Sequence, residues 1–211
     1  MADSQAACRI LINGIVQGVG FRPFVYQLAR DHQLAGQVAN TATGVTILLE
    51  GPKERLDRFL ADLPARKPPR AHIVETQSEP CAARGFTDFS IVPSQAGSQR
   101  FTLISPDVAV CADCLEEMRD PADRRYGYPF INCTNCGPRY TIITDVPYDR
   151  PKTAMRHFEL CADCRKEYED PLDRRFHAQP NACPVCGPTV WLCSGTGAVI
   201  AAEDPIAAAA E

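Results

Sequence analysis

The stretch Gly14-Ile-Val-Gln-Gly-Val-Gly-Phe-Arg22 decides the fold of the first part of the chain. In residues 8–13 before it, Cys8, Ile10 and Ile12 alternate with Arg9, Leu11 and Asn13, a period of two that predicts a strand. Residues 22–34 after it carry their apolar side chains on one side, as a helix would. Pro23 suits a first helical turn, because its missing N–H would be unpaired there in any case. The stretch therefore predicts a glycine-rich loop that joins a strand to the start of a helix.

A loop of this kind favours anions. Gly18 and Gly20 allow successive backbone N–H groups to point inward, and a helix start adds unpaired donors and the positive end of a dipole. Arg22 adds a planar guanidinium that can grip two oxygens of one phosphate. The loop matches neither the Walker A pattern nor G-x-G-x-x-G. A tight turn with an ordinary surface arginine is the alternative that the spacing leaves open.

Composition limits the class of protein. The chain has 211 residues, of which 45% are apolar, and this fraction is enough to form a hydrophobic core. The 23% of charged residues is too low a fraction for a wholly disordered chain. A formal charge of −4 gives no basic footprint for nucleic acid. No apolar run approaches the length of a membrane span, and residues 1–7 do not resemble a signal peptide. We therefore expect a cytoplasmic chain with no nucleic-acid or membrane partner, whose eleven cysteines are reduced and available for metal.

Residues 5–93 predict one small α+β domain. Strands are expected at residues 36–41 and 44–50, joined by a short turn, and two more at 70–79 and 86–92. A second helix over residues 52–63 shows a core-facing stripe, with Pro64 expected to stop it. The order β-α-β-β-α-β plus one strand is that of a ferredoxin-like split βαβ sandwich with both helices on one face.

The loop, with Asn40 closing the second strand and Gly44 in the turn, resembles the acylphosphatase family over residues 7–92. In that family the loop amides and the arginine bind the phosphate of an acyl phosphate, and the asparagine orients the attacking water. The resemblance implies catalytic roles for Arg22 and Asn40. The phosphate-binding residues that it implies are Gln17, Gly18, Val19, Gly20, Phe21 and Arg22.

The chemistry of these side chains agrees with that implication. Asn40 is neutral, so it can hold a water molecule but cannot act as a strong base. No general acid or base stands out in the loop, so only a phosphate with a good leaving group, such as a carboxylate or carbamate, suits the site. An asparagine that merely caps a hairpin is the alternative for Asn40.

Residues 94–109 predict a linker, and a tandem cysteine repeat follows it. Two modules, residues 111–136 and 161–186 within a region at 110–188, each contain C-x2-C-x18-C-x2-C and are related by an offset of 50 residues. Four thiolates at this spacing predict a closed, structural zinc site, with iron and disulfides as the alternatives. The predicted zinc ligands are Cys111, Cys114, Cys133 and Cys136 in the first module, and Cys161, Cys164, Cys183 and Cys186 in the second.

Charged residues recur between the cysteine pairs. Eight thiolates with two Zn²⁺ change the formal charge by −8 + 4 = −4, which the arginine pairs 124/125 and 174/175 can compensate. His177 stands where the first module has Gly127, so the module fold does not require a histidine there. A polar surface position and a functional position in a cavity both stay open for His177. The irregular segment 141–155 is expected to wrap one module against the other.

An acylphosphatase-like domain followed by the ordered motifs Ser105-Pro-Asp-Val-Ala-Val-Cys, Pro129-Phe-Ile-Asn-Cys-Thr-Asn-Cys and Arg174-Arg-Phe-His-Ala-Gln-Pro is similar to the N-terminal part of the HypF family of hydrogenase maturation carbamoyltransferases. The resemblance implies hydrolysis of carbamoyl phosphate or a similar acyl phosphate. It also implies two structural Zn²⁺, ATP used only in a later domain, and a maturation partner that accepts the carbamoyl group on a C-terminal cysteine. Residues 189–211 look like the truncated start of that ATP-dependent domain.

Two interpretations of function follow. The first is an acyl-phosphate hydrolase joined to a zinc scaffold. The second is a zinc-ribbon scaffold that binds a partner and carries a vestigial phosphate loop. Nucleic-acid binding is a third class, which the acidic charge balance disfavours.

Overall fold

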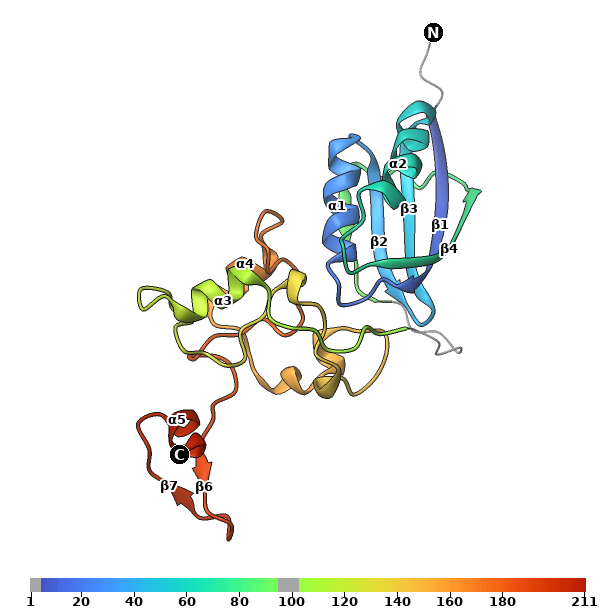
Figure 1. Ribbon diagram of the computed structural model, residues 1–211. Coiled ribbons are helices and arrows are strands. Elements are labelled where there is room, and N and C mark those ends of the chain that lie inside the picture. Colours follow the sequence, from blue (N-terminus) through green and yellow to red (C-terminus); the bar gives the residue numbers. More distant parts are fainter. Residues whose placement is uncertain (1–4, 95–102) are drawn as a thin grey trace.

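The computed structural model describes residues 5–94 and 103–211, so the predicted linker at 94–109 falls partly outside the described residues. Figure 1 shows a sheet with helices at the N-terminal end, an irregular middle part that contains α3 (Ala112–Arg119) and α4 (Ala162–Glu169), and a small C-terminal unit that projects from the rest. None of the helices in these described ranges has the length and apolar character needed to cross a membrane.

The N-terminal domain is the predicted α+β sandwich. In chain order it contains β1 (Gln5–Ile15), α1 (Phe21–Asp31), β2 (Ala35–Thr41), β3 (Gly44–Pro52), α2 (Lys53–Ala65), β4 (His72–Pro80) and β5 (Phe89–Ile91). The strands form one sheet in the order β4-β1-β3-β2-β5, antiparallel except for the pair β2 and β5. The ferredoxin-like arrangement predicted from the order of strand and helix segments in the sequence is therefore confirmed.

The core of this domain lies between the sheet and the two helices. Ile10, Ile12 and Ile47 from the central strands are fully buried, as are Val25 of α1 and Phe59 of α2. The stripe predicted on the second helix faces this core, since Leu56, Phe59 and Leu63 are buried. Because the central strands β1 and β3 are paired on both sides, the end of β1 and the start of α1 are held in fixed positions around the glycine-rich loop.

Several element ends differ from the predictions for local reasons. The first helix ends at Asp31 rather than residue 34, because Gln33 is left-handed (φ 52°) and the Leu34 N–H returns to the Ala29 carbonyl at 2.9 Å. The second helix includes Pro64 and ends one residue later, since a proline in the last turn removes only one hydrogen bond. The first strand is longer than residues 8–13, because it pairs with β3 and β4 over most of its length.

The fourth and fifth strands are shorter than expected. The fourth begins at His72 rather than residue 70, because the Ala71 N–H bonds back to the Pro68 carbonyl in a turn. The fifth is limited to Phe89–Ile91, the three residues that pair with β2.

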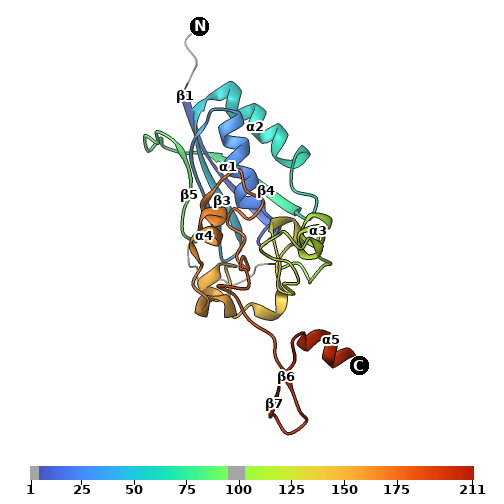
Figure 2. The ribbon, with the colours of Figure 1, turned by 90° about the vertical axis from the view of Figure 1, so that its left-hand side faces the viewer.

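The middle part contains the two cysteine modules. Helices α3 (Ala112–Arg119) and α4 (Ala162–Glu169) begin directly after the first cysteine of each module. Short 3-10 turns lie at Thr134–Cys136, Tyr140–Ile142, Arg150–Lys152 and Ala154–His157. Figure 2 shows this part lying against one end of the N-terminal sheet, near the start of α1.

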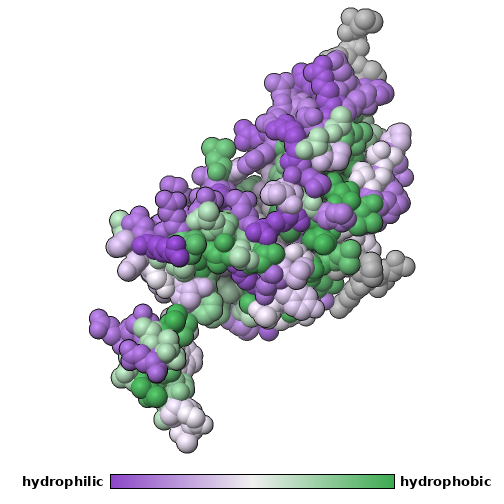
Figure 3. Space-filling view, in the orientation of Figure 1, coloured by the Kyte–Doolittle hydropathy of each residue, from purple (hydrophilic) through white to green (hydrophobic). Residues whose placement is uncertain are grey.

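The C-terminal unit contains β6 (Leu192–Cys193), β7 (Val199–Ile200) and α5 (Pro205–Ala210). It stands away from the modules in Figures 1 and 2, and Figure 3 shows hydrophobic atoms at its surface. Trp191, Val199 and Ile206 are each more than half exposed.

Candidate active site and metal centres

The glycine-rich loop has the shape that the sequence predicts. Gly18 and Gly20 adopt left-handed backbone conformations with φ of 72° and 74°, which a residue without Cβ reaches readily. Gly20 caps α1, which begins at Phe21, so the first N–H groups of the helix lie at the loop. The loop therefore presents a curved backbone and a helix start to the same space.

Arg22 and Asn40 lie on the walls of that space. The Arg22 side chain is 8% exposed, and its Nη2 lies 2.8 Å from Oδ1 of Asp149. Asn40, on β2, is completely buried; its Nδ2 donates to the Tyr148 carbonyl at 3.3 Å, and its Oδ1 has no hydrogen-bond partner among the described residues. The surface-arginine alternative for Arg22 is excluded by its burial.

The side chain of Gln17 joins the loop to two other segments of the chain. Its Nε2 donates to the carbonyls of Thr41 and Gly44 at 2.9 and 2.8 Å, and its Oε1 accepts from the Tyr148 N–H at 2.8 Å. The side chain thus ties the loop to the β2–β3 turn and to a segment more than 130 residues away. Gln17 shapes the loop through these three side-chain contacts.

A small cavity of about 20 Å³ lies between the loop and the cysteine modules. Four of the predicted phosphate-binding residues line it together with Asn40, namely Gly18, Gly20, Phe21 and Arg22, whereas Gln17 and Val19 do not. The opposite wall comes from the modules and the segment between them: Asn132, Cys133, Thr134, Gly137, Tyr148 and residues 177–180. The cavity therefore belongs to both parts of the chain.

The cavity wall is polar and incompletely hydrogen-bonded. Two buried polar atoms that have no partner among the described residues belong to residues of this wall, Asn40 Oδ1 and Asn132 Oδ1. Buried polar atoms are rarely left unpaired in native proteins. The wall is thus suited to an occupant that forms hydrogen bonds.

Several contributors to the site lie outside the predicted set, among them Tyr148, Asp149 and His177. Tyr148 and Asp149 come from the segment expected to wrap one module against the other, and that segment also contacts Asn40 and Arg22 beside the glycine-rich loop. Its Arg150 also donates to the Gln179 and Asn181 carbonyls of the second module, and its Met155 lies in a buried cluster with Ile131 of the first module and Ala182 of the second. His177 lines the cavity, where burial first and the charge of Arg22 second lower its pKa to about 4. The sequence shows these motifs but not that they meet the loop.

A methyl group at Gly18 tests this contact between the two parts. A Cβ there would stand 2.7 Å from Pro138 Cβ and 2.9 Å from Tyr148 Cε1, in a left-handed conformation. We expect Gly18→Ala to lower the free energy of unfolding by about 2 kcal/mol, through overpacking at the interface. Thermal and denaturant unfolding measure the change.

Gly85→Ala is the matched control, because Gly85 is also left-handed (φ 78°) but its Cβ would meet nothing within 4 Å. It carries the backbone strain without the clash. Equal destabilisation by the two substitutions would contradict a tight contact at Gly18.

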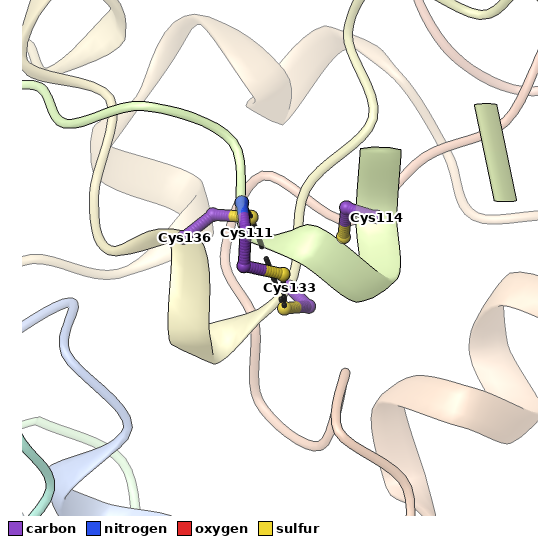
Figure 4. Close-up of side chains that lie close together, drawn as sticks. All are labelled: Cys111, Cys114, Cys133 and Cys136. Atoms are coloured by element: carbon purple, nitrogen blue, oxygen red, sulfur yellow. Dashed lines mark hydrogen bonds between the residues drawn. The ribbon is translucent and has the colours of Figure 1, made fainter. Parts of the chain in front are cut away.

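The eight predicted metal ligands form two clusters. In each, four cysteine sulfurs lie within 4.8 Å of one another, and Figure 4 shows the first, in which Cys111 and Cys114 meet Cys133 and Cys136. Neighbouring sulfurs are separated by 3.6 and 3.9 Å in the first cluster, and by 3.8 Å in the second. A tetrahedron of sulfurs at the Zn–S bond length has edges of about 3.8 Å. The two clusters fit two zinc ions, and all eleven cysteines are free of disulfides.

The arginine pairs cross between the modules. Arg124 of the first module donates to Cys164 Sγ of the second at 3.4 Å, and Arg174 of the second donates to Cys114 Sγ of the first at 2.9 Å. The neighbouring arginines form ion pairs with carboxylates of the other module: Arg125 pairs with Glu167, and Arg175 pairs with Glu117. The arginines are placed to compensate the charge of a metal-thiolate cluster, and each pair serves the cluster of the other module.

Comparison with known proteins gives two family matches and several close relatives. The Acylphosphatase family model matches residues 8–91, and the HypF finger model matches residues 110–143 and 160–193. A carbamoyltransferase HypF of Synechocystis is 48% identical over 149 residues, 71% of this chain and 19% of that protein. An acylphosphatase of Pseudothermotoga lettingae is 42% identical over 85 residues, 40% of this chain and 94% of that protein.

A crystal structure of full-length HypF in its phosphate- and nucleotide-bound form is similar to 98% of this chain, with a TM-score of 0.89 and 46% identity, and this match covers 27% of that chain. The chain spans about a fifth of the length of the curated HypF relatives it matches. The acylphosphatase match, the paired finger matches and this similarity agree, and the chain belongs to the HypF family.

Proposed function

We propose that this chain binds and hydrolyses an acyl phosphate, carbamoyl phosphate in particular. The observation that carries the proposal is that Arg22, Asn40 and the loop glycines line one cavity, in which the Asn40 oxygen has no partner among the described residues. The membership in the HypF family and the identity with acylphosphatases support the same reaction class.

In the proposed reaction the loop N–H groups and Arg22 hold the oxygens of the phosphoryl group. Asn40 accepts a hydrogen bond from a water molecule, whose oxygen attacks phosphorus. The bond between phosphorus and the acyl oxygen breaks, the carbamate leaves with the electron pair, and the water proton passes to a phosphate oxygen. Because carbamate is a good leaving group, positioning and charge stabilisation suffice.

In the whole HypF protein we infer that this step supplies carbamate. A later domain would activate the carbamate with ATP, and a maturation partner would accept the carbamoyl group on a C-terminal cysteine. The eight thiolates suit a reducing compartment such as the cytoplasm. We also propose that the two modules act as a scaffold, since their four-cysteine sites leave no open metal position.

One contact favours a second candidate. Asp149 pairs with Arg22 at 2.8 Å, and this ion pair would neutralise Arg22 permanently in a vestigial loop that no longer binds phosphate. The chain would then be a partner-binding zinc scaffold. Phosphate release from carbamoyl phosphate by the unaltered chain distinguishes the two, since the scaffold predicts no release above the spontaneous rate.

Asn40→Ala tests the mechanism. We expect hydrolysis to fall by about 10²-fold or more, because the attacking water loses its positioning group. Affinity for inorganic phosphate should change little, since Arg22 and the loop remain. A phosphate-release assay and titration calorimetry measure the two quantities.

The control is Asn135→Ala, at an exposed asparagine of the first module. If the Asn40→Ala chain lost affinity for phosphate by the same factor as its hydrolysis rate, the result would contradict a role of Asn40 in positioning water.

A further inference from the structure

The two modules differ at one informative position. His177 and its counterpart Gly127 both adopt left-handed backbone conformations, with φ of 54° and 65°. The fold of the module therefore requires this conformation, which glycine adopts freely and other residues adopt with strain. The first module meets the requirement with glycine, and the second carries an imidazole there. A residue held in an unfavourable backbone region points to a function of its side chain.

The backbone around His177 is fixed by hydrogen bonds. Its N–H donates to the Tyr168 carbonyl at 3.0 Å, and its carbonyl accepts from Gln179 Nε2 at 2.6 Å. Gln179 is itself held, because its Oε1 accepts from the Arg150 N–H at 2.7 Å and from the Tyr168 hydroxyl at 3.1 Å. The imidazole is therefore presented by a rigid support.

The ring lies in the wall of the phosphate cavity. It packs against the rings of Phe176 and Tyr168, with centroids at 4.6 and 5.1 Å. It lines the same cavity as Arg22 and Asn40, and neither ring nitrogen forms a hydrogen bond within the described part of the chain.

Resting on the proposed function, we propose that His177 is a substrate-binding residue of this cavity. Its ring N–H donates a hydrogen bond to an oxygen of the bound acyl phosphate, opposite the loop and Arg22. The second module would thus supply a direct substrate contact to a site otherwise built on the acylphosphatase fold.

The charges around the ring agree with this role. Arg22 from α1 is the charged group that acts on the ring, and Arg22, Asp149 and Arg150 act on the hydroxyl of the neighbouring Tyr168. With burial and Arg22 lowering its pKa to about 4, the ring is neutral at pH 7 and carries one N–H donor. It can donate to a phosphate oxygen as a neutral group.

The test compares His177→Gly with His177→Asn in the 211-residue chain. Glycine is the residue that the first module uses, so this variant should fold and bind two zinc ions. We expect it to weaken inorganic phosphate binding, and to raise KM for carbamoyl phosphate, by about tenfold, the effect of losing one hydrogen bond to a charged group. Asparagine tolerates the left-handed backbone and offers an N–H donor, so it should restore part of the loss.

Gly127→His is the matched control, since its Cβ would meet nothing within 4 Å, and it should leave both constants unchanged. Nuclear magnetic resonance of the four histidine rings gives an independent readout. Added phosphate should shift the His177 signals, and not those of the exposed His157, and Arg22→Ala should abolish the shift.

The outcomes separate the two proposals. The role of His177 would be overturned if a zinc-loaded His177→Gly chain kept its phosphate affinity and KM. It would also be overturned if added phosphate did not shift the His177 ring signals. Either result is compatible with hydrolysis by the unaltered chain. Absence of hydrolysis by the unaltered chain, together with a His177-dependent affinity for phosphate, would refute the proposed reaction and leave the binding contact intact.

Discussion

Replacing Arg22 by alanine is expected to reduce phosphate release from carbamoyl phosphate by 10²-fold or more, because a positioned charge aimed at the transferring group is usually worth about that much. The effect should exceed that of an exposed arginine, since the Arg22 side chain is 8% exposed and acts in a site with little water. Affinity for inorganic phosphate should fall as well, because Arg22 contacts ground state and transition state alike. Steady-state kinetics and titration calorimetry measure both.

The ion pair with Asp149 sharpens this experiment. Without Arg22 the Asp149 carboxylate, whose side chain is 21% exposed, keeps its negative charge beside the cavity and repels a phosphate dianion. The double variant Arg22→Ala with Asp149→Asn should therefore recover part of the lost phosphate affinity. Arg58→Ala, at an exposed arginine of α2, is the control for loss of one positive charge. An Arg22→Ala chain with normal hydrolysis would remove the basis of the proposed mechanism.

A single substitution in one cysteine cluster is expected to empty both clusters. Cys133→Ser removes a buried ligand of the first site, and without metal the first module lacks the energy to fold, which structural zinc supplies at about 10–16 kcal/mol. Arg124 and Arg125 then leave Cys164 and Glu167 of the second module. The second cluster loses the cations that compensate its charge, so its zinc should be released as well.

The measurement is metal content per chain. We expect two zinc ions in the unaltered chain and fewer than one after Cys133→Ser. Cys81→Ser, at an exposed cysteine outside the clusters, should retain both. A Cys133→Ser chain that holds one zinc in a folded second module would show that the crossed arginines are not needed for that module.

The sequence contains enough information for the elements and for the metal ligands. Hydrophobic period identifies the strands and helices because each has one buried face, as Ile10 and Ile12 of β1 and Phe59 of α2 illustrate. The cysteine spacing identifies both clusters because a metal site constrains the chain locally. Element ends are less accessible, since they depend on single hydrogen bonds such as that from Leu34 to Ala29.

The contacts that assemble the site could not be predicted from the sequence in the same way. Asn40 and Tyr148 are 108 residues apart, and no periodicity or motif relates them. The arginine pairs could be assigned to the thiolate clusters by counting charge, but not each to the cluster of the other module. Sequence patterns describe segments, whereas these contacts arise only when folded segments dock.

The contacts of Gln17 bear on how the acylphosphatase domain behaves in isolation. Its side chain joins the loop, the β2–β3 turn and the Tyr148 backbone. An excised domain would leave the Gln17 oxygen and the Asn40 amide to the solvent, free to re-pair with water. Kinetic constants obtained from such an excised piece would therefore describe a looser pocket than the one that works in the intact polypeptide.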